Sequence, residues 1–118
     1  MAIENTILLT TTGTESTEYQ YSNKQKGAGY YRRDYPLHTV VFQFDNFKGS
    51  VKIQATLALY PSNDDWFDVQ YDNGDTLEAV DSTPLITTTS RNFTGNFIWI
   101  RVAYQLEEGT ITEIRYSV

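Results

Sequence analysis

The sequence of 118 residues contains no cysteine and a single histidine, His38. The absence of cysteine excludes disulfides, thiolate metal sites, iron–sulfur clusters and cysteine nucleophiles. With only one histidine, a zinc site built from several histidines is excluded as well. Basic residues are also few, because nine Lys and Arg against fifteen Asp and Glu give a net charge of −6. This balance argues against non-specific binding to nucleic acid or to anionic membranes, which requires clustered Lys and Arg.

Long apolar runs are also missing from the sequence. Residues 7–9 form an apolar run that is far shorter than the roughly 7–15 residues of a signal-peptide core. The other apolar stretches fall short of the roughly 20 residues that a membrane helix requires. We therefore expect synthesis in the cytoplasm and no membrane partner. The length predicts one small domain, because a second core would need roughly 50 further residues.

Apolar and polar residues alternate through much of the chain, which predicts β-strands. Every odd position of residues 51–59 is apolar, so these side chains, including Leu57 and Leu59, are predicted to share one face. Residues 97–104 are apolar at nearly every position, as expected for a central strand that is covered on both sides. Shorter alternating runs occur at residues 38–44 and 111–118.

Turn-forming residues separate the predicted strands. Asn73-Gly74 indicates a two-residue hairpin, and residues 107–109 predict an antiparallel hairpin between the last two strands. Residues 45–49 predict a turn between two further strands, and Ser and Asp are suitable N-caps for a short helical turn at residues 62–65. About eight short strands at this spacing predict an all-β fold, a two-sheet antiparallel β-sandwich that is jelly-roll-like.

The N-terminal part of the chain differs from the rest in composition. Residues 10–29 are rich in polar residues and too poor in apolar ones to form a core of their own. We therefore divide the chain into a Ser/Thr-rich N-terminal arm or edge strand, residues 1–28, and a β-sandwich domain, residues 29–118. An extended arm that adds a strand to a neighbouring sheet would gain main-chain hydrogen bonds along its length.

The sequence offers no set of residues suited to catalysis. His38 is predicted to begin a strand and to share a face with Val40 and Phe42, and no G-x-S-x-G motif is present to position a serine nucleophile. The carboxylates between residues 64 and 75 suit a solvated loop better than a glycosidase pair. Calcium binding at residues 72–75 is a weaker alternative to a tight hairpin turn, because the residues do not match a calcium-loop pattern. We expect no catalytic residue, metal or cofactor.

Residues 27–36, Gly-Ala-Gly-Tyr-Tyr-Arg-Arg-Asp-Tyr-Pro, have the most unusual composition in the chain. Tyrosine supplies flat amphipathic area and arginine supplies forked donors, a combination that is enriched at protein interfaces. The same residues suit stacking on sugars or unpaired bases, although the net charge disfavours nucleic acid. They also suit packing on the chain's own sheet. For Trp66-Phe67, one ring is expected in the core and the other at an edge or interface. The predicted partner-binding residues are Tyr30, Tyr31, Arg32, Arg33, Tyr35 and Trp66.

Five segments of the chain resemble the small virion structural proteins of tailed bacteriophages, especially those of contractile-tailed phages of marine cyanobacteria. Three of them are N-F-K-G-S-V-K-I-Q-A-T-L-A at residues 46–58, D-W-F-D-V at residues 65–69 and N-F-T-G-N-F-I-W-I-R at residues 92–101. With residues 36–40 and 109–116 they span roughly residues 29–118 in similar order and spacing. Residues 1–28 have no counterpart in this resemblance.

The resemblance implies a non-enzymatic structural component of a phage particle with a β-sandwich body, located in the capsid, the neck or the tail. It transfers no catalytic residues, because the shared positions are turns and core strands. The implied partners are other virion proteins and copies of the same chain, which would assemble in the host cytoplasm. The alternative is a carbohydrate-binding or host-adhesion module, in which exposed aromatic side chains would contact a host-surface glycan.

Overall fold

The computed structural model describes residues 6–10, 19–31, 36–72, 74, 78–81 and 86–117. Within these ranges the chain is mostly antiparallel β-structure with one short α-helix, which confirms the expected all-β class. No helix in this part of the chain has the length and apolar character needed to cross a membrane. In chain order the elements are β1 (Thr6–Thr10), β2 (Gln20–Tyr21), β3 (Gln25–Lys26), α1 (Ala28–Tyr31), β4 (Leu37–Thr56), the 3-10 helix η1 (Asn63–Asp65), β5 (Phe67–Asp68), β6 (Glu78–Asp81), β7 (Ile86–Thr94) and β8 (Trp99–Ser117).

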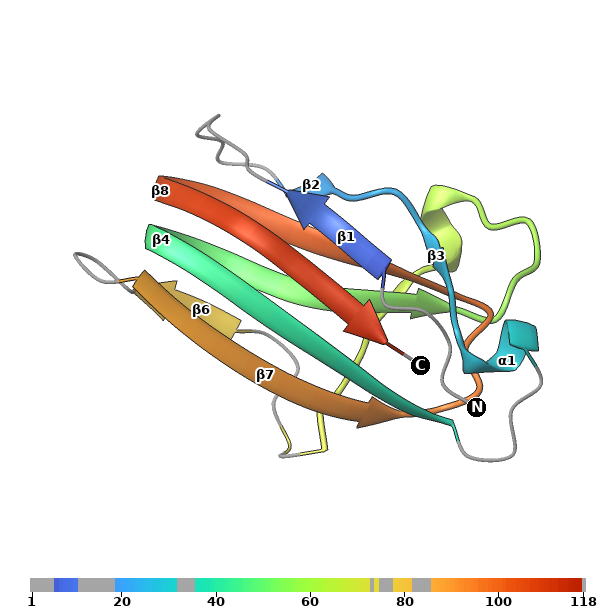
Figure 1. Ribbon diagram of the computed structural model, residues 1–118. Helices are drawn as coiled ribbons and strands as arrows, with labels where there is room; N and C mark the ends of the chain where they lie inside the picture. The colour runs from blue at the N-terminus through green and yellow to red at the C-terminus, as the bar shows by residue number, and fades with distance from the viewer. Residues whose placement is uncertain are drawn as a thin grey trace.

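Two long strands, β4 and β8, form the frame of the fold (Figure 1). They pair antiparallel from Thr39 opposite Ser117 to Thr56 opposite Trp99. The resulting ribbon bends midway and folds back, so that its two halves face each other across the interior. We call residues 37–45 with 110–117 the first half, and residues 48–56 with 99–106 the second half. All the described strands belong to one hydrogen-bonded sheet, because β4 and β8 run through both halves.

The bend replaces the hairpin that was predicted at residues 107–109. These residues lie inside β8, and both halves of β8 pair with β4 rather than with each other. β4 bends at the same level, where its register shifts and where Asn46 has a φ of 53°. Gly109 has a φ of 77°, and a Cβ added there would overlap the carbonyl oxygen of Asn46. The hairpin prediction is wrong because the same turn-forming residues also fit a bend in a strand whose partner bends with it.

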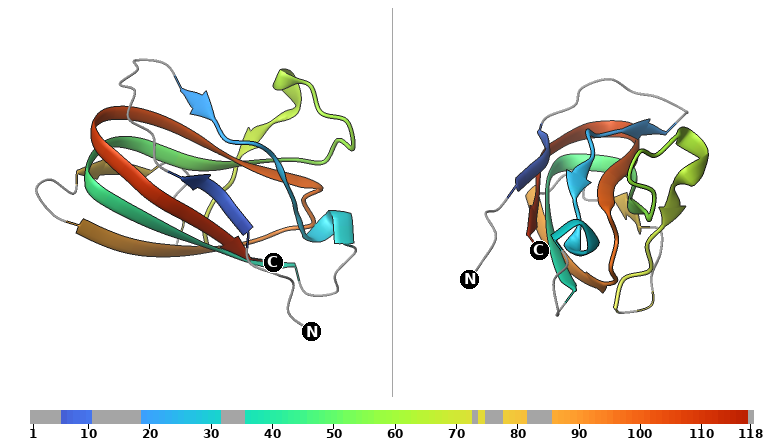
Figure 2. Two further views of the ribbon diagram at one scale, coloured as in Figure 1. Left: turned by 45° about the horizontal axis from the view of Figure 1, so that its top comes forward. Right: turned by 90° about the vertical axis from the view of Figure 1, so that its right-hand side faces the viewer.

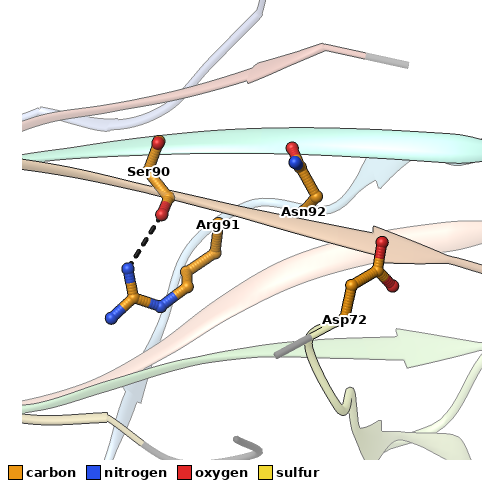
Figure 3. A pocket seen from close by; sticks show the side chains of 4 residues that line it. All are labelled: Asp72, Ser90, Arg91 and Asn92. Atoms are coloured by element: carbon orange, nitrogen blue, oxygen red, sulfur yellow. Dashed lines mark hydrogen bonds between the residues drawn. The ribbon is translucent and has the colours of Figure 1, made fainter. Parts of the chain in front are cut away.

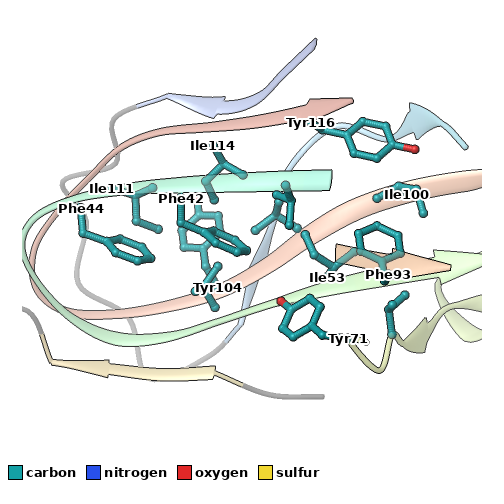
Figure 4. Close-up of a cluster of buried hydrophobic side chains, with 14 of the residues drawn as sticks. Phe42, Phe44, Ile53, Tyr71, Phe93, Ile100, Tyr104, Ile111, Ile114 and Tyr116 are labelled. Carbon is teal, nitrogen blue, oxygen red and sulfur yellow. The ribbon is translucent and has the colours of Figure 1, made fainter. Parts of the chain in front are cut away.

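The inner faces of the two halves form one hydrophobic core (Figure 4). In the first half the inward residues of β4 have even numbers, such as Phe42, whereas in the second half they have odd numbers, such as Ile53. The register shift at the bend moves the alternation by one residue, so apolar side chains stay inside in both halves. The core consists of Val40, Phe42, Phe44, Phe47, Val51, Ile53, Ala55, Val69, Tyr71, Phe93, Ile100, Val102, Tyr104, Leu106, Ile111, Ile114 and Tyr116.

Short strands extend both halves of the ribbon. In the first half, β7 pairs with β4 and β1 pairs with β8. In the second half, β2 and β3 pair with β8, while β5 and β6 pair with β4. The described strands of residues 1–28 therefore lie on the chain's own β8, and the addition of an arm to a neighbouring molecule stays a prediction.

The strands on either side of Asn73-Gly74 do not form the expected hairpin with each other. β5 pairs with residues 54–55 of β4, and β6 pairs with residues 48–51 of the same strand. Since both are antiparallel to β4, they run in the same direction along its edge. Asn73 itself lies outside the described residues. Asn73-Gly74 indicates only a local turn, whereas the positions of β5 and β6 depend on their hydrogen bonds to β4.

The alternation of residues 51–59 correctly predicts which side chains point into the core, but only up to the end of β4. β4 ends at Thr56, where the Thr56 hydroxyl accepts a hydrogen bond from the Ala58 N–H at 3.1 Å. Leu57 and Leu59 are therefore not on the inner face but are 66% and 51% exposed. In contrast, residues 100–104 are all buried, which confirms a central strand covered on both sides. The short helical turn is confirmed as η1, preceded by Ser62.

Candidate binding site

Among the residues whose exposure the structure describes, the exposed large hydrophobic side chains gather in one region. All of them lie on β2, α1, the loop after β4, and β5, which border the second half of the ribbon. Figure 2 shows α1 and the loop after β4 at the end of the molecule away from the bend. Such a concentration is typical of a surface that contacts a ligand or another molecule. These residues are Tyr21, Tyr30, Tyr31, Leu57, Leu59, Tyr60 and Phe67.

A hollow of about 500 Å³ lies within this region. Its wall is formed by the segment before β4, by the loop after β4 and by the first residue of β8. Trp99 is fixed to the loop, because its indole Nε1 donates a hydrogen bond to the Leu59 carbonyl oxygen at 2.9 Å. Tyr60 is 89% exposed at the rim. The lining residues are Lys24, Tyr30, Leu59, Tyr60, Pro61 and Trp99.

One lysine, Lys24, lines this hollow, and a second, Lys26, lies over the ring of the lining residue Tyr30. The Nζ of Lys24 lies 5.0 Å from the centre of the Trp99 ring, and the Nζ of Lys26 lies 4.6 Å from the centre of the Tyr30 ring. The Tyr30 and Trp99 rings are themselves in contact, with their centres 5.2 Å apart. Within the described part of the chain, no carboxylate is at ion-pairing distance from Lys24 or Lys26. The hollow is therefore locally cationic in a chain of negative net charge.

The predicted site residues are only partly brought together. Tyr30 and Tyr31 lie on α1, partly exposed and with their rings edge to face at 5.9 Å. Trp66 lies apart from them and covers the guanidinium group of Arg101, at 4.3 Å from its ring centre. Arg32, Arg33 and Tyr35 are outside the described residues. Sequence reasoning missed Lys24, Leu59, Tyr60, Pro61 and Trp99, which come from three distant segments without a common motif.

Neither ring of the Trp66-Phe67 pair enters the core, so the expectation of one buried ring is wrong. Trp66 is half-buried over Arg101, and Phe67 is exposed at the edge, where it meets Phe97 edge to face at 5.6 Å. The reason is that β5 is only two residues long and pairs with the end of β4. At this edge of the sheet the two rings pack on neighbouring side chains, Trp66 on Arg101 and Phe67 on Phe97, and not in the core.

The outer face of the second half is stabilised by Arg101. Its side chain is only 8% exposed and lies between the rings of Tyr21 and Trp66, 4.0 Å from the Tyr21 centre. The Nε of Arg101 also donates a hydrogen bond to Gln54 Oε1 at 2.9 Å. Burial disfavours the charged form and lowers the pKa of Arg101. These contacts hold the outer aromatic side chains on the sheet beside Trp99, which shares this face of β8.

His38 is a structural residue that anchors α1, and it shares the buried face of Val40 and Phe42 as predicted. Its Nε2 accepts a hydrogen bond from the Ala28 N–H at 3.1 Å, so Nδ1 carries the proton and donates to the Phe93 carbonyl oxygen at 3.3 Å. The ring also stacks on Phe93, with centres 4.6 Å apart. Burial lowers the pKa of His38 to about 4, so the neutral ring is the native form at neutral pH.

A second hollow, of about 360 Å³, opens beside β7 (Figure 3). It is lined by Asp72, Ser90, Arg91 and Asn92. Arg91 donates a hydrogen bond to the Ser90 carbonyl oxygen at 2.8 Å, and the Thr94 hydroxyl donates to Asp72 at 3.4 Å. The lining side chains combine opposite charges, from Asp72 and Arg91. Among the described residues, no three His, Cys, Asp or Glu side chains gather as a metal site would require. Part of the calcium candidate, residues 73 and 75, lies outside them.

The side chains that line the first hollow are suited to binding a ligand. Its aromatic faces suit flat or C–H-rich groups, and its lysines suit an anion. No family model matches the sequence, and no curated protein is significantly similar to it.

Proposed function

We propose that the chain is a non-enzymatic structural protein of a bacteriophage particle, in the capsid, the neck or the tail. It would assemble in the host cytoplasm through contacts with other particle proteins and with copies of itself. The resemblance of residues 29–118 to phage virion proteins supports this proposal. In this interpretation the two facing halves of the ribbon act as the two sheets of a jelly-roll-like β-sandwich.

The observation that carries the proposal is the concentration of exposed apolar side chains around the second half of the ribbon. Leu57, Leu59 and Tyr60 follow one another along the loop after β4, and all three are more than half exposed. Burying each large apolar side chain against a partner is worth about 1.5–3 kcal/mol. Tyrosine and tryptophan are also enriched among the interface residues that contribute most to the binding free energy. An assembly protein has a physical reason to keep such side chains exposed in the free molecule.

Copy number in purified particles tests the proposal directly. Quantitative mass spectrometry of particles of the phage that encodes the chain should detect it at a fixed ratio to the major capsid protein. Hundreds of copies would indicate the capsid or the tail tube, and about a dozen would indicate the neck or baseplate. A chain that is expressed during infection but absent from particles would overturn the proposal.

The contact surface is tested with matched variants in the particle. Leu57→Ser combined with Tyr60→Ser should reduce incorporation, because the exposed apolar area is lost without touching the core. Val41→Ser, on the outer face of the first half, serves as the control and should be incorporated normally. Equal incorporation of both variants would place the contact elsewhere on the molecule.

Carbohydrate binding is the second candidate function, and the hollow beside Trp99 is the observation that favours it. A recess of about 500 Å³ falls within the range of small-molecule sites, roughly 300–1,000 Å³. The hollow brings the aromatic rings of Tyr30, Tyr60 and Trp99 to one recess. Binding of the purified chain to a glycan array, lost in Tyr30→Ala and Tyr60→Ala, would support this function.

A further inference from the structure

We propose that the hollow between Lys24, Tyr30, Trp99 and residues 59–61 binds a sugar that carries a carboxylate. This inference rests on the second candidate function, carbohydrate binding, and names the class of sugar. It follows from two properties that occur together only here in the described part of the molecule. One is an aromatic wall around a recess, and the other is a pair of lysines without carboxylate neighbours.

The aromatic wall is held in place before any ligand arrives. Trp99 is the first residue of β8 and is bonded through its indole N–H to the Leu59 carbonyl oxygen. The loop is fixed again just beyond Pro61, where the Ser62 N–H donates to the Asp65 carboxylate at 2.7 Å. Tyr30 contacts Trp99 from the other side, and α1 is anchored by the bond from Ala28 to His38. A wall that is already ordered loses little conformational entropy on binding.

The rings favour the C–H face of a pyranose as their occupant. The face of an aromatic ring carries partial negative charge and attracts the slightly positive C–H groups of a sugar. Tyr60 presents most of its ring to solvent at the rim, and Trp99 lies within the recess. The volume suits one or two sugar rings but is not a long groove, which an extended nucleic acid strand would require.

The lysines select for an anionic sugar. Lys24 lines the recess, and Lys26 lies two residues further along the same segment over Tyr30. The other lysine on this side of the sheet, Lys52, differs, because its Nζ is paired with Asp68 at 3.1 Å. A single carboxylate on the ligand would therefore meet two cations that form no ion pair with any acidic residue that the structure describes.

The test compares two ligands that differ only in the carboxylate, methyl β-D-glucuronide and methyl β-D-glucoside. Both are titrated into the ¹⁵N-labelled full chain while the two tryptophan indole N–H signals are followed by NMR. The chain has two tryptophans, so Trp66 is an internal control for Trp99. We expect the glucuronide to shift the Trp99 signal, leave Trp66 unchanged, and bind about threefold to tenfold more tightly than the glucoside.

Two lysine variants sharpen the result. Lys24→Gln should remove the preference for the glucuronide while leaving weak binding of both sugars. Lys52→Gln, which alters a lysine that also lies over a tyrosine ring, should keep the preference. Tyr60→Ala should weaken both sugars equally, and because this side chain is 89% exposed the variant is expected to fold normally.

Each other result would overturn the inference. Equal affinity for both sugars would exclude selection by charge but would leave carbohydrate binding in place. No shift of the Trp99 signal with either sugar at 10–20 mM, about the weakest binding that such a titration detects, would exclude the site and the second candidate function together. A Trp99 signal that responds to protein concentration instead would assign the hollow to a second copy of the chain. The structural role in the particle is judged separately by copy number.

Discussion

The two halves of the ribbon have similar side chains on their inner faces but different side chains on their outer faces. Inside, both present alternate apolar side chains to one core. Outside, the described side chains of the first half are mostly polar, as where the Thr39 hydroxyl donates to Asn92 Oδ1 at 2.9 Å on the neighbouring strand. The second half carries Trp99, Arg101 and the aromatic residues that cover them. The comparison indicates that folding constrains the inner residues of both halves, whereas the exposed large hydrophobic side chains that the structure describes border the second half.

Removing one large core side chain from either half should produce the largest losses of stability. Phe42→Ala in the first half is expected to lower the free energy of unfolding by about 3–5 kcal/mol, and Ile53→Ala in the second by about 2–5 kcal/mol. Both side chains are fully buried in the same cluster. Urea denaturation measures both losses. A loss below about 1 kcal/mol for either variant would show that its half does not share the common core.

Acidification should destabilise the protein through His38, the residue that joins the first half to α1. The pKa of His38 is lowered from 6.5 to about 4 in the folded state, so the unfolded chain takes up the proton first as the pH falls. The free energy of unfolding should therefore decrease between about pH 6.5 and pH 4, by up to about 3 kcal/mol, and then level off.

The contribution of His38 is isolated by comparison with His38→Gln, which cannot titrate. The difference in the free energy of unfolding between the two proteins should change across this pH range, while the shared carboxylates cancel. A difference that is constant from pH 7 to pH 4 would contradict a neutral, buried imidazole.

The bend that connects the halves should be sensitive to a single added methyl group. Gly109→Ala places a Cβ against the Asn46 carbonyl oxygen at a positive φ, and we expect a loss of about 2–3 kcal/mol. Gly74→Ala is the matched control, because Gly74 has a φ of 99° but no atom within 4 Å of the added Cβ. It should lose only about 1 kcal/mol. Thermal unfolding of both variants separates the cost of the close approach to Asn46 from the cost of the positive φ. Equal losses of stability in the two variants would contradict a contribution from the close approach.

The smallest effects should come from the outer faces, where two arginines provide a direct comparison. Arg101→Ala removes a guanidinium held between two rings and should lower the free energy of unfolding by about 2 kcal/mol. Arg115→Ala, in the first half, removes an exposed ion pair with Glu113 and should change the free energy of unfolding by less than about 1 kcal/mol. Chemical denaturation of the two variants in parallel measures this contrast. Similar losses would mean that the aromatic cover of Arg101 adds no stability.

Much of the fold could be predicted from residue patterning. Alternation identified the inward residues of β4 and β8, because only a period of two keeps apolar side chains on one face of a strand. It could not identify where the strand ends, so Leu57 and Leu59 were assigned to the inside although β4 stops at Thr56. It also could not distinguish a hairpin from a bend at residues 107–109. That choice depends on pairing with β4, which is distant in sequence.

The candidate site was harder to predict because its parts are far apart along the chain. Composition pointed to Tyr30 and Tyr31, since aromatic residues were clustered there in sequence. Lys24, Tyr60 and Trp99 have no such local signal, and they meet only when β3 pairs with β8 and the loop after β4 folds against Trp99. One hint was available: an arginine at position 101, within an otherwise apolar strand, indicates an outer face that needs partners.

The continuous pairing of β4 with β8 has a consequence for how quickly the molecule can fold. The partners that β4 and β8 bring together are all distant along the chain, and the pair nearest in sequence is Thr56 and Trp99. Closing that long loop would begin the pairing of β4 with β8, and the ribbon would then zip from there toward Thr39 and Ser117. Folding of this kind is slow, on the order of milliseconds to seconds. The last backbone hydrogen bonds to form would then be those of the first half, farthest from the aromatic hollow.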